Sequence, residues 1–465
     1  MNQKVKNIPN KFTEGSITKS IFALAIPIVL SNLLQTAYQL TDTFWVGRLG
    51  ANALASVSLS FPIIFLIISL GGGFGTAGAI LVAQFKGKEA TREVNHIAGQ
   101  TFLMMFFVSI ILAVIGIIFS PLIITLMGAD KLVMLDAVSY MKISFFGMIF
   151  TFIYFAFQSL MRGVGDVKTP MYIVLFTVLL NLVLDPLFIF GFGIFPPMGV
   201  TGAAVATLVA QAISATIGIW LLMNGKHEIK LQYSNFTPDF SLIKKIFRLG
   251  LPSSLEQSGR ALGMLAMTFI VAYFGTTIIA SYGIGMRILS FIIIPSIGLA
   301  MATSTLVGQN IGAGKIERAE KIAKRSMLAG FLIMGISGLI LFIFSREITM
   351  AFIPNDEAVI KEGSYLVRVL SVTFGFVSLQ QITTGVLRAS GKTITAMMLT
   401  ITSLWLLRFP IAIFFAFYTQ YSFRGVWWSF PIANIISVFL ALLIFFNGSW
   451  KKKKLTEEIK VDKAI

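Results

Sequence analysis

The chain has 465 residues, of which 56% are hydrophobic and 12% are charged, and it contains no cysteine. A soluble domain usually carries about 25% charged residues, so the composition excludes an ordinary soluble protein, and the high hydrophobic content excludes a disordered one. The absence of cysteine excludes a disulfide scaffold, a zinc ribbon and an iron–sulfur protein. The composition therefore predicts a membrane protein, and the net charge of +17 has to be explained by where the basic residues lie.

Twelve apolar stretches follow one another along the chain, and each is long enough for a helix of about 20 residues to cross the roughly 30 Å of membrane hydrocarbon. They cover residues 20–46, 53–80, 95–120, 133–159, 168–191, 199–223, 246–272, 278–306, 322–345, 360–386, 393–418 and 424–447. The stretches are continuously apolar rather than alternating, which argues against the strands of a membrane barrel. We therefore expect an all-α membrane protein with twelve transmembrane helices.

The basic residues are distributed unevenly among the connections. Most of the 37 lie at the two termini and in the connections after the second, fourth, sixth, eighth and tenth stretches. The alternate connections hold few, such as Arg48, Lys131, Arg346 and Arg424. By the positive-inside rule we expect a multi-pass protein of the cell membrane with both termini in the cytoplasm. Because topology explains the basic excess, we expect no nucleic-acid partner.

The two halves of the chain align when the sequence is shifted by 225 residues, so that Pro27 meets Pro252 and Gln84 meets Gln309. Each half holds six of the apolar stretches, which predicts two six-helix lobes related by a pseudo-twofold axis along the membrane normal. We place the N-lobe at 20–223 and the C-lobe at 246–447, with a cytoplasmic segment at 1–19, a cytoplasmic linker at 224–245 and a basic cytoplasmic tail at 448–465. Two such lobes suit a transporter that works by alternating access.

Polar side chains at membrane depth mark functional sites or partners, because burying them in hydrocarbon is costly. In the N-lobe, helical spacing places polar residues on one face of the first, fifth and sixth stretches: Gln35, Gln39 and Asp42; Asn181 and Asp185; Thr207 and Gln211. Two carboxylates beside neutral oxygens can carry a proton or hold a hard cation such as Na⁺. The alternative is that they are polar contacts between helices.

The seventh stretch carries Glu256, Gln257 and Arg260. Because Glu256 and Arg260 are four residues apart, they either form an intrahelical ion pair or belong to a second ion or substrate site. We take these three residues, together with Gln35, Tyr38, Gln39 and Gln211, as candidates for the substrate cleft. The chain has only two histidines, so we expect no cofactor other than the coupling ion.

Taken together, these features resemble the multidrug and toxic compound extrusion (MATE) family over residues 12–447. The resemblance rests on Pro27, Tyr38 and Asp42 in the first stretch and on residues 162–166, 181–186, 202–207 and 250–254. It implies a twelve-helix antiporter, not an enzyme, that exports amphipathic, mainly cationic compounds in exchange for Na⁺ or H⁺.

The resemblance also implies site residues. Asp42, Asn181, Asp185 and Thr207 match the cation site of the N-lobe, with Tyr38 nearby. Family members with a second cation site carry a glutamate where this chain has Arg260, which argues against a C-lobe site here. We expect the protein to act as a monomer on small-molecule drugs or toxins. A flippase of lipid-linked or natural-product substrates from the same superfamily and an intramembrane enzyme are the alternatives.

Overall fold

The structure is a computed structural model that describes residues 12–193, 195–225, 227–452 and 455–458. Within these residues the chain is helical, apart from one isolated bridge between Phe192 and Phe195. The prediction of an all-α protein is therefore confirmed.

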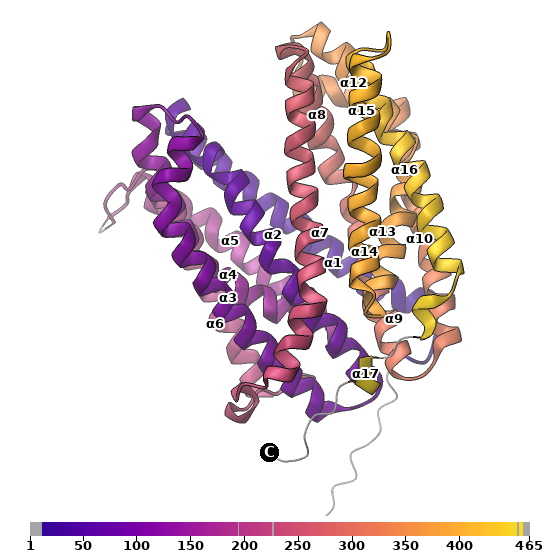
Figure 1. The fold of residues 1–465 in the computed structure, drawn as a ribbon. Helices are drawn as coiled ribbons and strands as arrows, with labels where there is room; N and C mark the ends of the chain where they lie inside the picture. Colours follow the sequence, from indigo (N-terminus) through magenta and orange to yellow (C-terminus); the bar gives the residue numbers. More distant parts are fainter. Residues whose placement is uncertain (1–11, 194, 226, 453–454, 459–465) are drawn as a thin grey trace, which may run out of the picture.

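The N-lobe contains six long helices, shown from indigo to magenta in Figure 1. They are α1 (Ile17–Gly47), α2 (Ala51–Gly87), α3 (Thr91–Leu126), α4 (Lys131–Val164), α5 (Lys168–Phe190) and α6 (Val200–Asn224). Acidic side chains fix some of the helix starts: Asp130 accepts a hydrogen bond from the backbone N–H of Lys131 at the start of α4. A short 3-10 turn, η1 (Tyr233–Phe236), follows α6 in the chain that leads to the C-lobe.

The C-lobe repeats the six spans with more interruptions. Its elements are α7 (Phe240–Ala272), α8 (Thr276–Ile292), α9 (Ile294–Gly312), α10 (Ile316–Ile343), α11 (Ser345–Phe352), α12 (Glu357–Ser371), α13 (Phe374–Ala389), α14 (Thr393–Ile401), η2 (Thr402–Arg408), α15 (Phe409–Phe417) and α16 (Phe423–Phe446). The tenth predicted span is the pair α12 and α13, which is bent by 52°. The eleventh span is α14, η2 and α15, and its middle, η2, is a π-helix.

Ten helical stretches among the described residues are long and apolar enough to cross a membrane. Two of them combine labelled elements: α8 with α9, and α14 with η2 and α15. The bent pair of α12 and α13 makes an eleventh span. The twelfth is α7, which is 33 residues long but carries three basic residues in its first turns and Glu256 and Arg260 further along. Each of the twelve predicted spans thus corresponds to a helix or to consecutive helical segments. The helices extend beyond several of the predicted stretches because their polar ends remain helical.

One predicted boundary differs from the structure, and part of the predicted tail is helical. The predicted linker 224–245 includes the start of α7, where Asp239 accepts hydrogen bonds from the backbone N–H groups of Ser241 and Leu242. The predicted tail 448–465 contains two short helical elements, η3 (Ser449–Lys452) and α17 (Leu455–Glu458), and Trp450 and Leu455 are fully buried. The described residues of the tail, 448–452 and 455–458, therefore pack on the protein through Trp450 and Leu455. Residues 1–11 of the predicted N-terminal segment lie outside the described residues.

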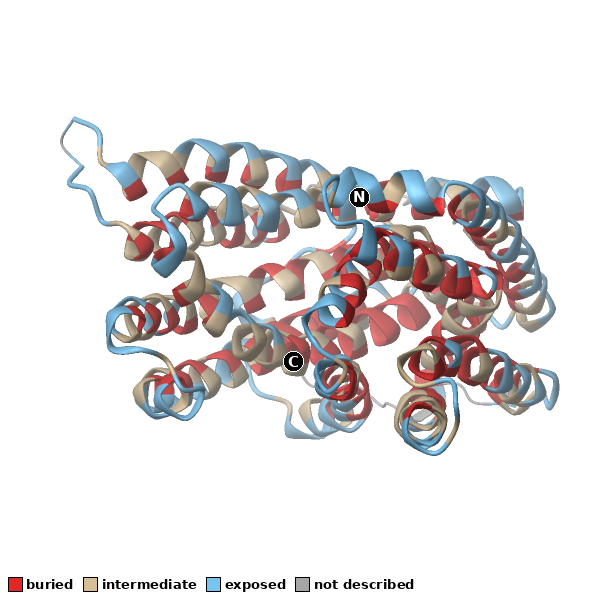
Figure 2. Cartoon of the chain, turned by 90° about the horizontal axis from the view of Figure 1, so that it is seen from above, coloured by how far each residue is buried: buried red, intermediate tan, exposed pale blue. Residues whose placement is uncertain are grey.

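The two lobes meet at one end of the molecule, and their ribbons diverge toward the other end (Figure 1). We call the meeting end the basic end; it contains the connections α2–α3, α4–α5, α6–α7, α9–α10 and α13–α14 together with α17. Here α1 packs against α9 and α7 packs against α2, so the first helix of each lobe contacts the other lobe. Figure 2 shows buried residues on helix faces that turn toward one another and exposed residues on the outer surface.

The lobe junction at the basic end follows the internal repeat. Gln84 of α2 donates from its side-chain amide to the carbonyl of Ala389 (2.7 Å), and Gln309 of α9 donates to the carbonyl of Gly163 (2.9 Å). The backbones of α2 and α9 also cross closely, since a side-chain carbon added at Gly87 or at Gly312 would collide with a carbonyl oxygen of the opposite lobe. The pseudo-twofold relation of the sequence is thus a set of paired contacts in the structure.

Candidate functional site

The polar residues predicted for the N-lobe lie together where α1, α5 and α6 pack against one another. Asp42 lies five residues before the end of α1, and Asp185 lies five residues before the end of α5. Both are therefore close to the end of the membrane-spanning segments that is opposite to the basic end. Asp185 and Asn181 are fully buried, and Asp42 and Thr207 are half-buried.

Two hydrogen bonds organise this group, which we call the N-lobe acidic cluster: Asp42, Asn181, Asp185 and Thr207. The side-chain amide of Asn181 donates to Oδ1 of Asp185 at 2.9 Å, one helical turn along α5. The hydroxyl of Thr207 donates to Oδ2 of Asp42 at 3.3 Å, from α6 to α1. The two carboxyl groups are neighbours across the α1–α5 contact. The four residues that the sequence singled out are thus brought together.

The cluster leaves several buried oxygens without a hydrogen-bond partner. They are Oδ1 of Asp42, Oδ1 of Asn181, Oδ2 of Asp185, the hydroxyl of Tyr38 and Oε1 of Gln211. Buried polar atoms are nearly always bonded, so a concentration of free oxygens beside two carboxyl groups is unusual. Carboxylate, amide and hydroxyl oxygens are the ligands that a hard cation prefers, and a proton on either carboxyl group would also find an acceptor. These residues therefore fit a Na⁺ ion or a proton.

The surroundings of the cluster include Thr177, which shares the four-residue spacing of Asn181 and Asp185, and other polar residues that the sequence did not single out. Tyr140 of α4 packs against the apolar cluster that contains Val46 and Ile189, near enough to both carboxyl groups to interact with them electrostatically, and Ser144 lies close to its hydroxyl. One turn deeper, the hydroxyls of Thr177 and Ser214 are hydrogen-bonded at 2.5 Å between α5 and α6. Tyr140 and Ser144 are four residues apart on the fourth predicted span, and this spacing was the signal that could have found them.

The remaining cleft candidates are placed as follows. Gln35 and Tyr38 are half-buried on α1, whereas Gln39 is exposed, and Gln211 is half-buried on α6. Gln257 of α7 faces Gly72 of α2, so it lies at the contact between the lobes rather than within one lobe. The structure therefore separates Gln257 from the N-lobe acidic cluster.

In the C-lobe, Glu256 is the centre of a second polar network. Its carboxylate, which is 1% exposed, accepts hydrogen bonds from Arg260 (2.8 Å), Arg388 (2.5 Å) and Thr400 (2.8 Å). Arg260 also donates to the side chain of Gln381. The structure thus contains the intrahelical ion pair that the spacing allowed, and it adds Arg388, a partner 132 residues away in sequence. With both oxygens of Glu256 bonded to arginines, this carboxylate differs from those of the N-lobe.

A sequence model of the MatE family matches residues 27–187 and 252–414, one segment in each lobe. The chain belongs to the MatE family. These are the multidrug and toxic compound extrusion transporters, so the protein is a membrane transporter and not an enzyme, as the sequence predicted.

Individual relatives agree with this assignment over nearly the whole chain. The chain is 30% identical to a probable multidrug resistance protein, YoeA, of Bacillus subtilis, over 97% of this chain and 98% of the relative. It is 28% identical to the probable multidrug resistance protein NorM of Thermotoga maritima, with 97% of each covered. A solved multidrug resistance MATE transporter in an outward-facing conformation has a TM-score of 0.90 and 25% identity, covering 97% of this chain and all of that one.

Proposed function

We propose that this MATE transporter exports amphipathic, mainly cationic organic compounds from the cell in exchange for Na⁺ or H⁺. The observation that carries the proposal is the N-lobe acidic cluster, in which Asp42 and Asp185 are neighbours and three buried oxygens, on Asp42, Asn181 and Asp185, lack a partner. Two neighbouring carboxylates in a low dielectric repel each other, so the pair favours binding one cation or one proton. Release of that ion and binding of a cationic drug are then alternative ways to neutralise the same region.

The basic end supports an orientation for this cycle. By the positive-inside rule we assign it to the cytoplasm, with both termini on that side of the cell membrane. The lobes are in contact at this end, through Gln84 and Gln309 among others. We therefore assign this conformation to the outward-facing state, in which the ion enters from outside and opening of the basic end releases it inside.

The driving force follows from the charge that crosses the membrane. One positive charge entering a cell at 100 mV contributes about 2.3 kcal/mol, which is equivalent to a roughly 50-fold accumulation of an exported neutral compound. A one-for-one exchange of two monovalent cations gains only from the ion's concentration gradient. Export of a neutral compound should therefore depend on the membrane voltage, whereas one-for-one export of a monovalent cation should not.

The first test is dye efflux from vesicles that contain the purified protein, with Na⁺ and pH gradients imposed separately. We expect one gradient to drive efflux of a cationic dye such as ethidium, which identifies the ion. Asp42→Asn keeps the shape of the side chain but removes its charge, so we expect it to abolish gradient-driven efflux. Asp136→Asn, an exposed carboxyl group of α4, is the matched control. Unchanged efflux by Asp42→Asn would remove the ion-coupling proposal.

A second candidate is export of an anionic, lipid-linked compound, and one observation favours it. Arg260 and Arg408 of the C-lobe each leave a buried Nε without a partner, although the guanidinium of Arg408 lies 4.5 Å from the ring of Phe430 and donates to Asn434. An anionic headgroup would accept hydrogen bonds from these two Nε–H groups. Competition of dye efflux by a lipid-linked anionic compound, reduced in Arg408→Gln, would favour this candidate over drug export.

A further inference from the structure

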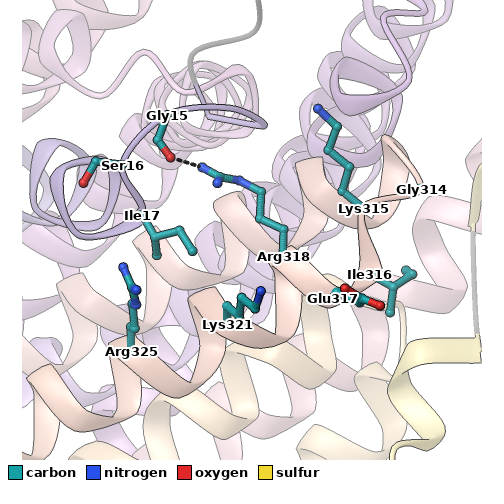
Figure 3. A pocket seen from close by; sticks show the side chains of 10 residues that line it. All are labelled: Gly15, Ser16, Ile17, Gly314, Lys315, Ile316, Glu317, Arg318, Lys321 and Arg325. Carbon is teal, nitrogen blue, oxygen red and sulfur yellow. Dashed lines mark hydrogen bonds between the residues drawn. The ribbon is translucent and has the colours of Figure 1, made fainter.

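A cavity of about 720 Å³ opens at the basic end between the start of α1 and the first turns of α10 (Figure 3). We call it the α1/α10 cavity. Four basic side chains and one acidic side chain, Glu317, line it from the C-lobe, and Gly15, Ser16 and Ile17 of the chain entering α1 form the opposite wall. The basic residues are Lys315, Arg318, Lys321 and Arg325. Arg318, Lys321 and Arg325 are three to four residues apart, so they share one face of α10.

The positive charge of this cavity is only partly compensated. Arg318 donates to the backbone carbonyls of Glu14 (3.0 Å) and Gly15 (2.9 Å), and its buried Nε has no partner. Lys315 is 3.2 Å from the carboxylate of Glu14. Among the described residues, neither Lys321 nor Arg325 forms an ion pair with an acidic side chain. Figure 3 shows the ends of Arg318 and Arg325 directed toward residues 15–17.

The internal repeat provides a comparison within the same molecule. The 225-residue shift places Lys321 on His96 and Arg325 on Gln100 of α3. There the carboxylate of Asp239 lies 3.2 Å from His96, and the amide of Gln100 donates to the chain that leads into α7. The same shift places Asp239 on Glu14, whose carboxylate lies 3.2 Å from Lys315 in the C-lobe copy.

Asp239 is a stable anion in that place. Burial acts to raise its pKa, but hydrogen bonds from the N–H of Leu242, from Ser241 and from His96 outweigh burial and hold the pKa below its usual value. At these two positions the C-lobe copy carries two positive charges, Lys321 and Arg325, where the N-lobe copy has His96 and Gln100. Because Glu14, the counterpart of Asp239, pairs with Lys315, it leaves Lys321 and Arg325 without an acidic partner among the described residues, and these two side chains suit an anion from outside the chain.

The surface next to the cavity indicates what carries that anion. After Lys321 and Arg325 along α10, the same face continues away from the basic end with four exposed apolar residues. They are Leu328, Leu332, Ile336 and Leu339, which are 60%, 52%, 60% and 60% exposed. Exposed apolar residues in a membrane-spanning helix contact lipid chains. A phospholipid has a charged headgroup and apolar acyl chains. The cationic site at the membrane surface matches an anionic headgroup, and the lipid-facing stripe matches the chains.

We propose that the α1/α10 cavity binds the phosphate group of an anionic phospholipid from the leaflet at the basic end, with its acyl chains along α10. Basic pockets between transmembrane helices on the cytoplasmic side bind such headgroups, and the start of α1 adds the positive end of a helix dipole. Because the cavity wall combines the N-terminal segment and α10, a bound lipid would connect the two lobes at this end.

The test measures lipid binding to the purified full-length chain by native mass spectrometry. Phosphatidylglycerol, phosphatidylcholine and inorganic phosphate are added in separate arms. We expect selective binding of phosphatidylglycerol, and binding about 30-fold weaker in Lys321→Gln/Arg325→Gln because two basic groups are removed. Each single substitution should give an intermediate loss. Lys88→Gln/Lys324→Gln is the matched control, since it removes two basic groups outside the cavity, one of them on α10 and paired with Glu320.

Equal binding of phosphatidylglycerol by the wild type and the double variant would overturn the proposal. Equal binding of phosphatidylcholine would overturn it as well, since that headgroup has no net charge. If inorganic phosphate bound through Lys321 and Arg325 and the lipid did not, the site would be one for a soluble phosphate, and the lipid assignment would be wrong. The melting temperature of each variant, which we expect to be unchanged because both side chains are exposed, separates these outcomes from loss of folding.

Discussion

At the scale of single residues, the N-lobe acidic cluster shows what helical spacing can and cannot predict. The four-residue interval between Asn181 and Asp185 placed both on one helix face, and the structure contains a hydrogen bond between them. Asp42 of α1 and Thr207 of α6 reach the same place because three helices pack together. The spacing of residues within one helix does not predict that packing. The spacing of Tyr140 and Ser144 marked a polar face of α4, but their position near the carboxyl groups also depends on this packing.

The role of the second carboxylate can be tested by Asp185→Asn. The amide keeps the hydrogen-bonding shape but removes one of two adjacent negative charges. Hydrogen bonds to charged groups are worth about 1.5–3 kcal/mol, so we expect the half-saturating concentration of the coupling ion to rise by about tenfold or more. The measurement is dye efflux as a function of ion concentration. An ion dependence identical to that of the wild type would reduce Asp185 to a packing role.

At the scale of the helices, α7 combines a membrane span with a buried ion network. The sequence predicted Arg260 as a possible partner of Glu256 because both lie on one helix, whereas Arg388 and Thr400 come from α13 and α14. The π-helix η2 and the bend between α12 and α13 were also not predicted, because apolar stretches fix the length of a span but not its interruptions.

Removing the centre of this network should destabilise the fold. Glu256→Gln leaves Arg260 and Arg388 without their common anion, and breaking one partner of a buried ion pair costs about 3–5 kcal/mol. We therefore expect a clearly lower melting temperature in detergent, measured by thermal unfolding. The same substitution at Glu357, which pairs with Arg346 on the surface, should change stability by only about 0–1 kcal/mol. Equal melting temperatures for the two variants would show that the network contributes little.

At the scale of the whole molecule, the internal repeat predicted two lobes, and the structure shows where they touch. Gln84 and Gln309 align in the sequence, but only the structure reveals that each donates a hydrogen bond across the junction. Sequence similarity identifies equivalent positions, and it contains no information on which of them meet.

The junction can be locked covalently, because the chain has no cysteine of its own. A β-carbon added at Gly308 of α9 would lie 3.1 Å from that of Ala83 of α2, so a small outward shift of the helices would give the roughly 3.8 Å of a disulfide. We expect Ala83→Cys/Gly308→Cys to stop efflux after oxidation and to recover it after reduction, because the basic end could no longer open. Each single-cysteine variant should remain insensitive to oxidant. Full activity of the cross-linked protein would contradict a cycle that requires this end to separate.

The carboxyl-terminal turn α17 adds a consequence for such a cycle. The backbone N–H of Leu455 donates to the side chain of Gln84. The side chain of Leu455 packs in the N-lobe core and beside Gly391 of the C-lobe. If the basic end separates, Leu455 must leave one of these neighbours and travel with the other. A fluorophore attached at this turn would therefore report which half of the molecule carries the end of the chain during each turnover.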